Sequence, residues 1–311
     1  MGTNPAGPSA FRTASGDLRA PWRVAIFGTA LVACGVAVSV IGFSIAASTR
    51  LIGWARIARL PLDQIAITGS VIAATWFTGR LVHGDRHRVW DRIGFGREAW
   101  RARALVLGAS VGALAIAVPS LLMLAFGGMR IESAVAADSP AVAAWAAFAL
   151  LLPAAVTEEV LIRGYLFSAC RDGMGTSRAI IVTSVLFGLA HLANPEPTVV
   201  SMIAVTFAGL FLAVVRVSTG SLVAACTAHL AFNLTQVVAL HAPVSGLALE
   251  TPGYRTVSVG PDWLTGGAWG PEGGAGVIAA LALASFIVWN RMPAPHEPTT
   301  PTPTPLPAAT P

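Results

Sequence analysis

Long apolar segments separated by short polar loops make up most of this chain. Eight of them are long enough, or nearly so, to cross about 30 Å of hydrocarbon as helices that rise about 1.5 Å per residue. This pattern predicts an all-α fold, a polytopic transmembrane helical bundle of about eight spans. The segments are residues 23–47, 65–82, 104–127, 141–169, 178–193, 197–215, 219–240 and 273–290.

The polar parts of the chain divide it into three regions. Residues 1–22 predict a disordered N-terminus, residues 23–290 the bundle, and the Pro/Thr-rich residues 291–311 a disordered tail. Within the bundle, the Gly- and Pro-rich residues 241–272 predict an irregular loop. Residues 48–64 combine apolar side chains with arginines, which fits an interfacial helix on the outer face; the alternative is that the first span is placed wrongly.

Composition agrees with a membrane protein. The 311 residues are 55% hydrophobic and only 11% charged, whereas soluble domains carry about 25% charged residues. The net charge of +5 does not predict a nucleic-acid partner, because the arginines flank the spans and no nucleic-acid-binding motif is present. The three cysteines form no C-x-x-C pair, so neither a zinc knuckle nor a disulfide framework is indicated.

The distribution of arginines predicts the orientation. Fourteen arginines flank the spans on the side of the N-terminus and five on the opposite side. Cytoplasmic loops carry the excess of basic residues. We therefore expect a multi-pass protein of the plasma membrane, in contact with the lipid bilayer, with both termini cytoplasmic.

Three polar clusters interrupt the apolar spans. A charge at the bilayer centre costs at least about 2.5–3.5 kcal/mol on insertion scales, so ionisable residues inside spans indicate a functional site. The clusters are Glu158, Glu159 and Arg163; Phe187 and His191; and His229 and Asn233.

Three of these residues lie at one depth. Glu158, His191 and His229 are each thirteen residues from the arginine that bounds their segment on the predicted cytoplasmic side, which is about 20 Å along a helix. Three helices that present polar groups at the same level predict one shared site.

Helical spacing refines the prediction. Glu159 and Arg163 are four residues apart and can pair along one helix face. Glu158 then points elsewhere and is free for chemistry. His229 and Asn233 are also four residues apart, so both project from one face of their helix.

The motifs that contain these residues resemble those of a known family. EEVLIRGYLF, FGLAH and GSLVAACTAHLAFN are similar, in this order, to the EExxxR, FxxxH and HxxxN motifs of the CPBP family. That family comprises CAAX prenyl proteases and Abi bacteriocin-processing proteins and is classed as intramembrane metalloproteases. The resemblance covers roughly residues 140–240. The sequence departs from the family pattern at Ile162, where the family often has Phe. This position has no chemical role.

The resemblance implies an endopeptidase that acts on a peptide or protein. Glu158 would be the general base on a water that His191 helps to bind and orient, and His229 and Asn233 would donate to the oxyanion. Glu159 and Arg163 would form a supporting pair. Phe187, one turn before His191, would pack beside its ring.

The sequence leaves two forms of the site open. Glu158, His191 and His229 could be three ligands of a divalent metal such as Zn, with water in the fourth position. Glu159 would then serve as the base and would not pair with Arg163. The same groups could also work without a metal.

Two other functions compete with proteolysis. A non-catalytic immunity or peptide-binding protein of the same family would not need both a base and an oxyanion site, so the complete set of residues favours the enzyme. A transporter that uses the buried carboxylates as proton carriers would show repeated halves and broken helices, and the sequence contains neither feature.

Overall fold

The computed structural model describes residues 10–13, 15–46, 61–84, 86–134, 139–249 and 252–291. The predicted interfacial helix at 48–64 and the predicted tail at 291–311 fall almost entirely outside these ranges. The three predicted regions, 1–22, 23–290 and 291–311, stay predictions.

The predicted helical bundle is confirmed. Each of the eight predicted apolar segments contains a helix, and within the described residues seven helices are long and apolar enough to cross a membrane. The eighth, α12, has 17 residues and so spans about 25 Å. The predicted orientation stays a prediction. The long helices are α1 (Ala20–Ala46), α3 (Leu62–His83), α5 (Ala102–Ala125), α6 (Pro140–Glu159), α8 (Thr176–Ala190), α9 (Val199–Thr219), α10 (Leu222–Leu234) and α12 (Ala275–Arg291).

Shorter elements extend or connect these helices. α6 continues through η2 (Val160–Leu166) into α7 (Phe167–Met174), η3 (His191–Ala193) follows α8, and η4 (Thr235–Ala239) follows α10. The other connecting elements are α4 (Arg86–Arg92), η1 (Arg97–Trp100), α11 (Asp262–Thr265), η5 (Gly267–Trp269) and η6 (Pro271–Gly273).

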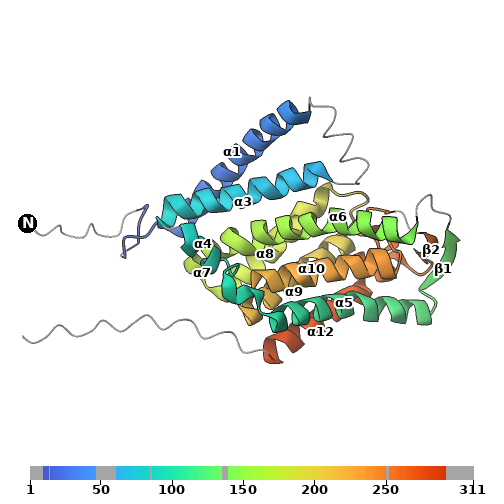
Figure 1. The fold of residues 1–311 in the computed structure, drawn as a ribbon. Helices are drawn as coiled ribbons and strands as arrows, with labels where there is room; N and C mark the ends of the chain where they lie inside the picture. The colour runs from blue at the N-terminus through green and yellow to red at the C-terminus, as the bar shows by residue number, and fades with distance from the viewer. Residues whose placement is uncertain are drawn as a thin grey trace, which may run out of the picture.

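Helix α10 lies at the centre of the bundle, in contact with α5, α6 and α9 (Figure 1). α12 packs on α9 and α5, whereas α1 contacts mainly α3. Two glycines bring α5 close to α10, because a side chain at Gly108 or Gly112 would overlap the carbonyl of Ala224 or Ala228. Small residues at helix contacts are typical of membrane bundles, where close van der Waals packing drives association. This packing fixes the helix that carries His229.

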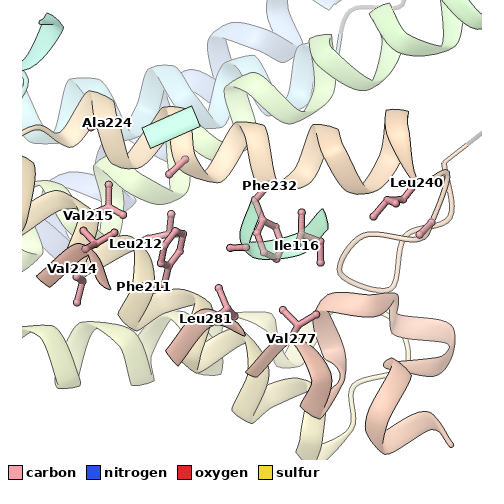
Figure 2. Close-up of a cluster of buried hydrophobic side chains, with 14 of the residues drawn as sticks. Ile116, Phe211, Leu212, Val214, Val215, Ala224, Phe232, Leu240, Val277 and Leu281 are labelled. Carbon is pink, nitrogen blue, oxygen red and sulfur yellow. The ribbon is translucent and has the colours of Figure 1, made fainter. Parts of the chain in front are cut away.

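The largest apolar cluster joins four helices. Figure 2 shows Phe232 of α10 and Ile116 of α5 directed into the same space as Val277 and Leu281 of α12. Phe211 of α9 belongs to the same cluster. Side chains from four helices thus interlock on the side of α10 that faces α9 and α12.

A two-stranded sheet was not predicted. β1 (Met129–Ala134) pairs antiparallel with β2 (Gly253–Ser258), with Met129 opposite Ser258. The stretch 241–272, predicted as an irregular loop, therefore contains a strand and short helices. β2 pairs with β1, which lies more than a hundred residues earlier in the chain. A partner so far away leaves no local pattern in the sequence. The sheet lies at the end of the bundle away from the start of α1 (Figure 1).

Candidate active site

The helix that carries both glutamates changes its winding at the site. Glu158 and Glu159 end α6, and the next seven residues, η2, are π-helical. Gly164 within η2 has a non-helical ψ of −113°. π-helical turns inside α-helices occur frequently at functional sites. Here the change of winding directly follows the two carboxylates and includes Arg163.

Arg163 connects three helices through a fully buried ion pair. Its Nη1 donates to Glu159 Oε1 over 3.0 Å, and both side chains are 0% exposed. Its Nη2 donates to the carbonyl of Gly209 in α9 over 3.0 Å. The guanidinium also lies 4.0 Å from the ring centroid of Phe187 in α8, at cation–π distance. The predicted Glu159–Arg163 contact is present, and it links α6 and η2 to α8 and α9.

His229 contacts the same carboxylate. Its Nδ1 lies 3.0 Å from Glu159 Oε1. An ionised carboxylate only accepts hydrogen bonds, so Nδ1 carries the proton. This contact fixes the ring so that Nε2 lies 3.9 Å from Glu158 Oε2. A contact between His229 and Glu159 was not predicted, because no local pattern links residues 70 positions apart.

His191 is oriented in the same manner by a backbone carbonyl. It follows the last residue of α8, and its Nδ1 donates to Phe187 O over 2.8 Å. Its Nε2 is then directed to Glu158 Oε2, 3.8 Å away. The Phe187 and His191 ring centroids are 4.6 Å apart, so Phe187 packs beside the imidazole as its spacing predicted.

Glu158 stands between the two imidazoles. Its side chain is 34% exposed, but Oε2 is buried and has no hydrogen-bond partner among the described residues. The distances of 3.8 and 3.9 Å to the two Nε2 atoms are too long for direct hydrogen bonds and leave room for a bridging water. The structure therefore brings Glu158, His191 and His229 together from three helices.

A small cavity adjoins the imidazoles. Its water-accessible volume is about 30 Å³, and a cavity needs about 10–15 Å³ to hold one water. His191, His229 and Asn233 line it. Asn233 lies one turn after His229, so both face the cavity as the sequence predicted.

Two further residues of the cavity wall were not predicted. Ser245 and Glu272 also line this cavity, although both lie in the Gly- and Pro-rich stretch after α10. The only sequence signal was an isolated acidic residue in GPEGG, which is more typical of a solvated turn.

The metal set predicted from the sequence, Glu158, His191 and His229, stays a prediction. No group of three or more His, Cys, Asp and Glu side chains in the described residues is placed to hold a metal ion. This applies to Glu158, His191 and His229 as well.

Comparison with protein families gives a match to part of the chain. The family described as type II CAAX prenyl endopeptidase Rce1-like matches residues 140–235. This range agrees with residues 140–240, where the motifs were recognised, and contains all seven candidate residues. No curated protein and no solved structure matches the chain. Ser245, Glu272, the β-sheet and α12 lie outside the matched range.

Proposed function

Residues 140–235 form a domain of the Rce1-like type II CAAX prenyl endopeptidase family, which implies an intramembrane peptidase, and we propose that this chain hydrolyses a peptide bond of a membrane-associated peptide or protein. The site lies within a multi-pass helical bundle. The orientation that accompanies the proposal has both termini on the cytoplasmic side, as the arginines predict.

One observation carries the proposal. The buried, unpartnered Oε2 of Glu158 lies within 4 Å of the Nε2 atoms of His191 and His229. A water between these atoms can donate one proton to Glu158 and another to His191 Nε2, which is an acceptor because Nδ1 is the protonated nitrogen. The arrangement supports a water that is both held and activated by a carboxylate.

The hydrolytic step follows from these positions. Glu158 Oε2 takes a proton as the water oxygen bonds to the carbonyl carbon, and the carbonyl electron pair moves onto its oxygen. The C–N bond then breaks, and the amine leaves with the proton that Glu158 returns. No atom or electron other than those of water and the peptide is consumed.

Asn233 and His229 are proposed to stabilise the oxyanion. The Asn233 amide offers N–H donors to the cavity. His229 donates from Nε2 when it is an imidazolium, and the Glu159 carboxylate 3.0 Å from Nδ1 pairs with that cation. Donors aimed at developing charge in a water-poor site contribute strongly to catalysis. Glu159, Arg163 and Phe187 are positioning residues in this scheme.

The proposal is tested by cleavage in liposomes. Wild type and Glu158→Gln are incubated with a library of peptides that each contain one apolar membrane segment, and products are read by mass spectrometry. We expect Glu158→Gln to lower the cleavage rate about 10²- to 10⁴-fold. Glu196→Gln is the matched control, because Glu196 is exposed and outside the cavity; it should cleave as wild type does.

The outcomes separate the alternatives. Equal rates for wild type and Glu158→Gln would remove Glu158 from the mechanism. Binding of peptides by the wild type without any cleavage would favour the non-catalytic immunity or peptide-binding function. The assay is repeated with a chelator, and unchanged activity is expected; a loss that Zn²⁺ restores would assign Glu158, His191 and His229 to a metal.

A further inference from the structure

The cavity contains an acidic residue with no role in the mechanism above. Glu272 lies in η6, directly before α12, and is only 7% exposed. It lines the same cavity as His191, His229 and Asn233. A buried carboxylate in the wall of this cavity can contact a substrate group that enters it.

Among the described residues, the carboxylate accepts hydrogen bonds at one oxygen. Oε1 accepts hydrogen bonds from the backbone N–H and the hydroxyl of Ser245, the latter over 2.9 Å. Ser245 has a φ of 50°, a left-handed conformation that non-glycine residues rarely adopt. Asn194 Nδ2 donates to the Ser245 carbonyl over 3.2 Å. Contacts with two other segments thus hold Ser245, and through it Glu272, in place.

No cationic side chain among the described residues forms an ion pair with this carboxylate. Within the described residues Glu159 is paired with Arg163, whereas Glu272 has no ion pair with an arginine or a histidine. His191 and His229 line the same cavity. A buried carboxylate requires either a proton or a cation, and burial accordingly raises the pKa of Glu272.

We propose that Glu272 is a subsite for a primary ammonium group of the peptide substrate, carried either by a lysine side chain or by a free amino terminus. This inference rests on the proposed peptidase function and adds a substrate preference to it. The cavity of about 30 Å³ admits a group the size of one or two waters. An ammonium is a compact charge of that size, whereas the planar guanidinium of arginine is larger.

The test measures binding and does not depend on cleavage. Calorimetry compares butylammonium, butylguanidinium and neutral butanol on the Glu158→Gln protein in detergent, where Glu272 is the remaining unpaired carboxylate of the site. We expect butylammonium to bind more tightly than the other two by about 10- to 100-fold, the range for a hydrogen bond to a charged group. Adding Glu272→Gln should remove that preference, while adding Glu196→Gln should leave it.

Two arms distinguish the sources of the ammonium. One peptide is acetylated and has a single lysine; the other has a free amino terminus and no lysine. The peptide that displaces butylammonium identifies the source, and displacement by neither overturns the proposal.

Equal binding of butanol and butylammonium also overturns the proposal. This comparison tests the ammonium subsite even if Glu272→Gln fails to fold. Butylammonium binding can be present when no peptide is cleaved, so the failure of one proposal is distinguishable from the failure of the other.

Discussion

Glu159 Oε1 accepts hydrogen bonds from His229 Nδ1 and from Arg163 Nη1, each over 3.0 Å. One buried oxygen thus joins the ion pair of α6 and η2 to the histidine of α10. Because this contact sets the direction of the His229 ring, the supporting pair and the reacting groups form a single network. Changes to the pair are expected to affect both stability and catalysis.

The buried pair should show strong coupling in a double-mutant cycle. Arg163→Met leaves the Glu159 carboxylate buried without its cation, and we expect a loss of about 3–5 kcal/mol in the free energy of unfolding. Adding Glu159→Gln removes the uncompensated charge, so the double variant should be more stable than the sum of the single changes predicts. Unfolding in mixed micelles measures each value. Additive single effects would mean that the two side chains do not interact.

Gly209 should not tolerate a side chain. An added Cβ would lie 3.1 Å from Arg163 Nη2 and 3.1 Å from the Ser184 backbone, so the Arg163 side chain and the α8 backbone would have to shift by a few tenths of an ångström. We expect Gly209→Ala to cost about 1–3 kcal/mol, as overpacking does. Gly28→Ala in α1 is the matched control, because a Cβ there meets nothing within 4 Å. Thermal unfolding in detergent compares them, and equal stability of both variants would contradict the close contact.

Asn233→Ala should affect the transition state rather than substrate binding. Loss of one oxyanion donor lowers kcat about 10²- to 10³-fold, and we expect KM to change little. Asn290→Ala serves as the control, because the Asn290 side chain is exposed and donates to Phe286 O within its own helix. Steady-state cleavage of a peptide in liposomes gives both constants. A rise in KM with unchanged kcat would instead assign Asn233 to substrate binding.

Glu272 should make stability depend on pH. Burial raises its pKa in the folded protein, so the folded state binds more protons than the unfolded state once pH exceeds about 4.3, the ordinary value for Glu. Stability therefore falls as pH rises from there through the raised pKa. His191 and His229 line the same cavity as Glu272, and both are kept in every variant compared.

The measurement is the melting temperature in detergent between pH 4 and 8. Glu272→Gln should lose this fall with pH, whereas Glu196→Gln should follow the wild type. A curve for Glu272→Gln that is parallel to the wild-type curve would show that Glu272 ionises as an exposed carboxyl does.

The sequence by itself determined the bundle and most of the candidate residues. Apolar length predicts spans because backbone groups in lipid must be paired within a helix. Four-residue spacing predicts which side chains share a helix face, and this was sufficient for the contact of Glu159 with Arg163 and for that of Phe187 with His191. Both signals are local and can be read from one helix at a time.

Only the tertiary structure decided which partners meet across helices. The contact of Glu159 with His229, the pairing of β1 with β2 and the presence of Glu272 at the cavity all join segments far apart in the chain. Such contacts depend on how closely the helices approach, which glycines such as Gly112 and Gly209 set by allowing backbone contact. No periodicity in the sequence encodes that distance, because it arises from the packing of many side chains at once.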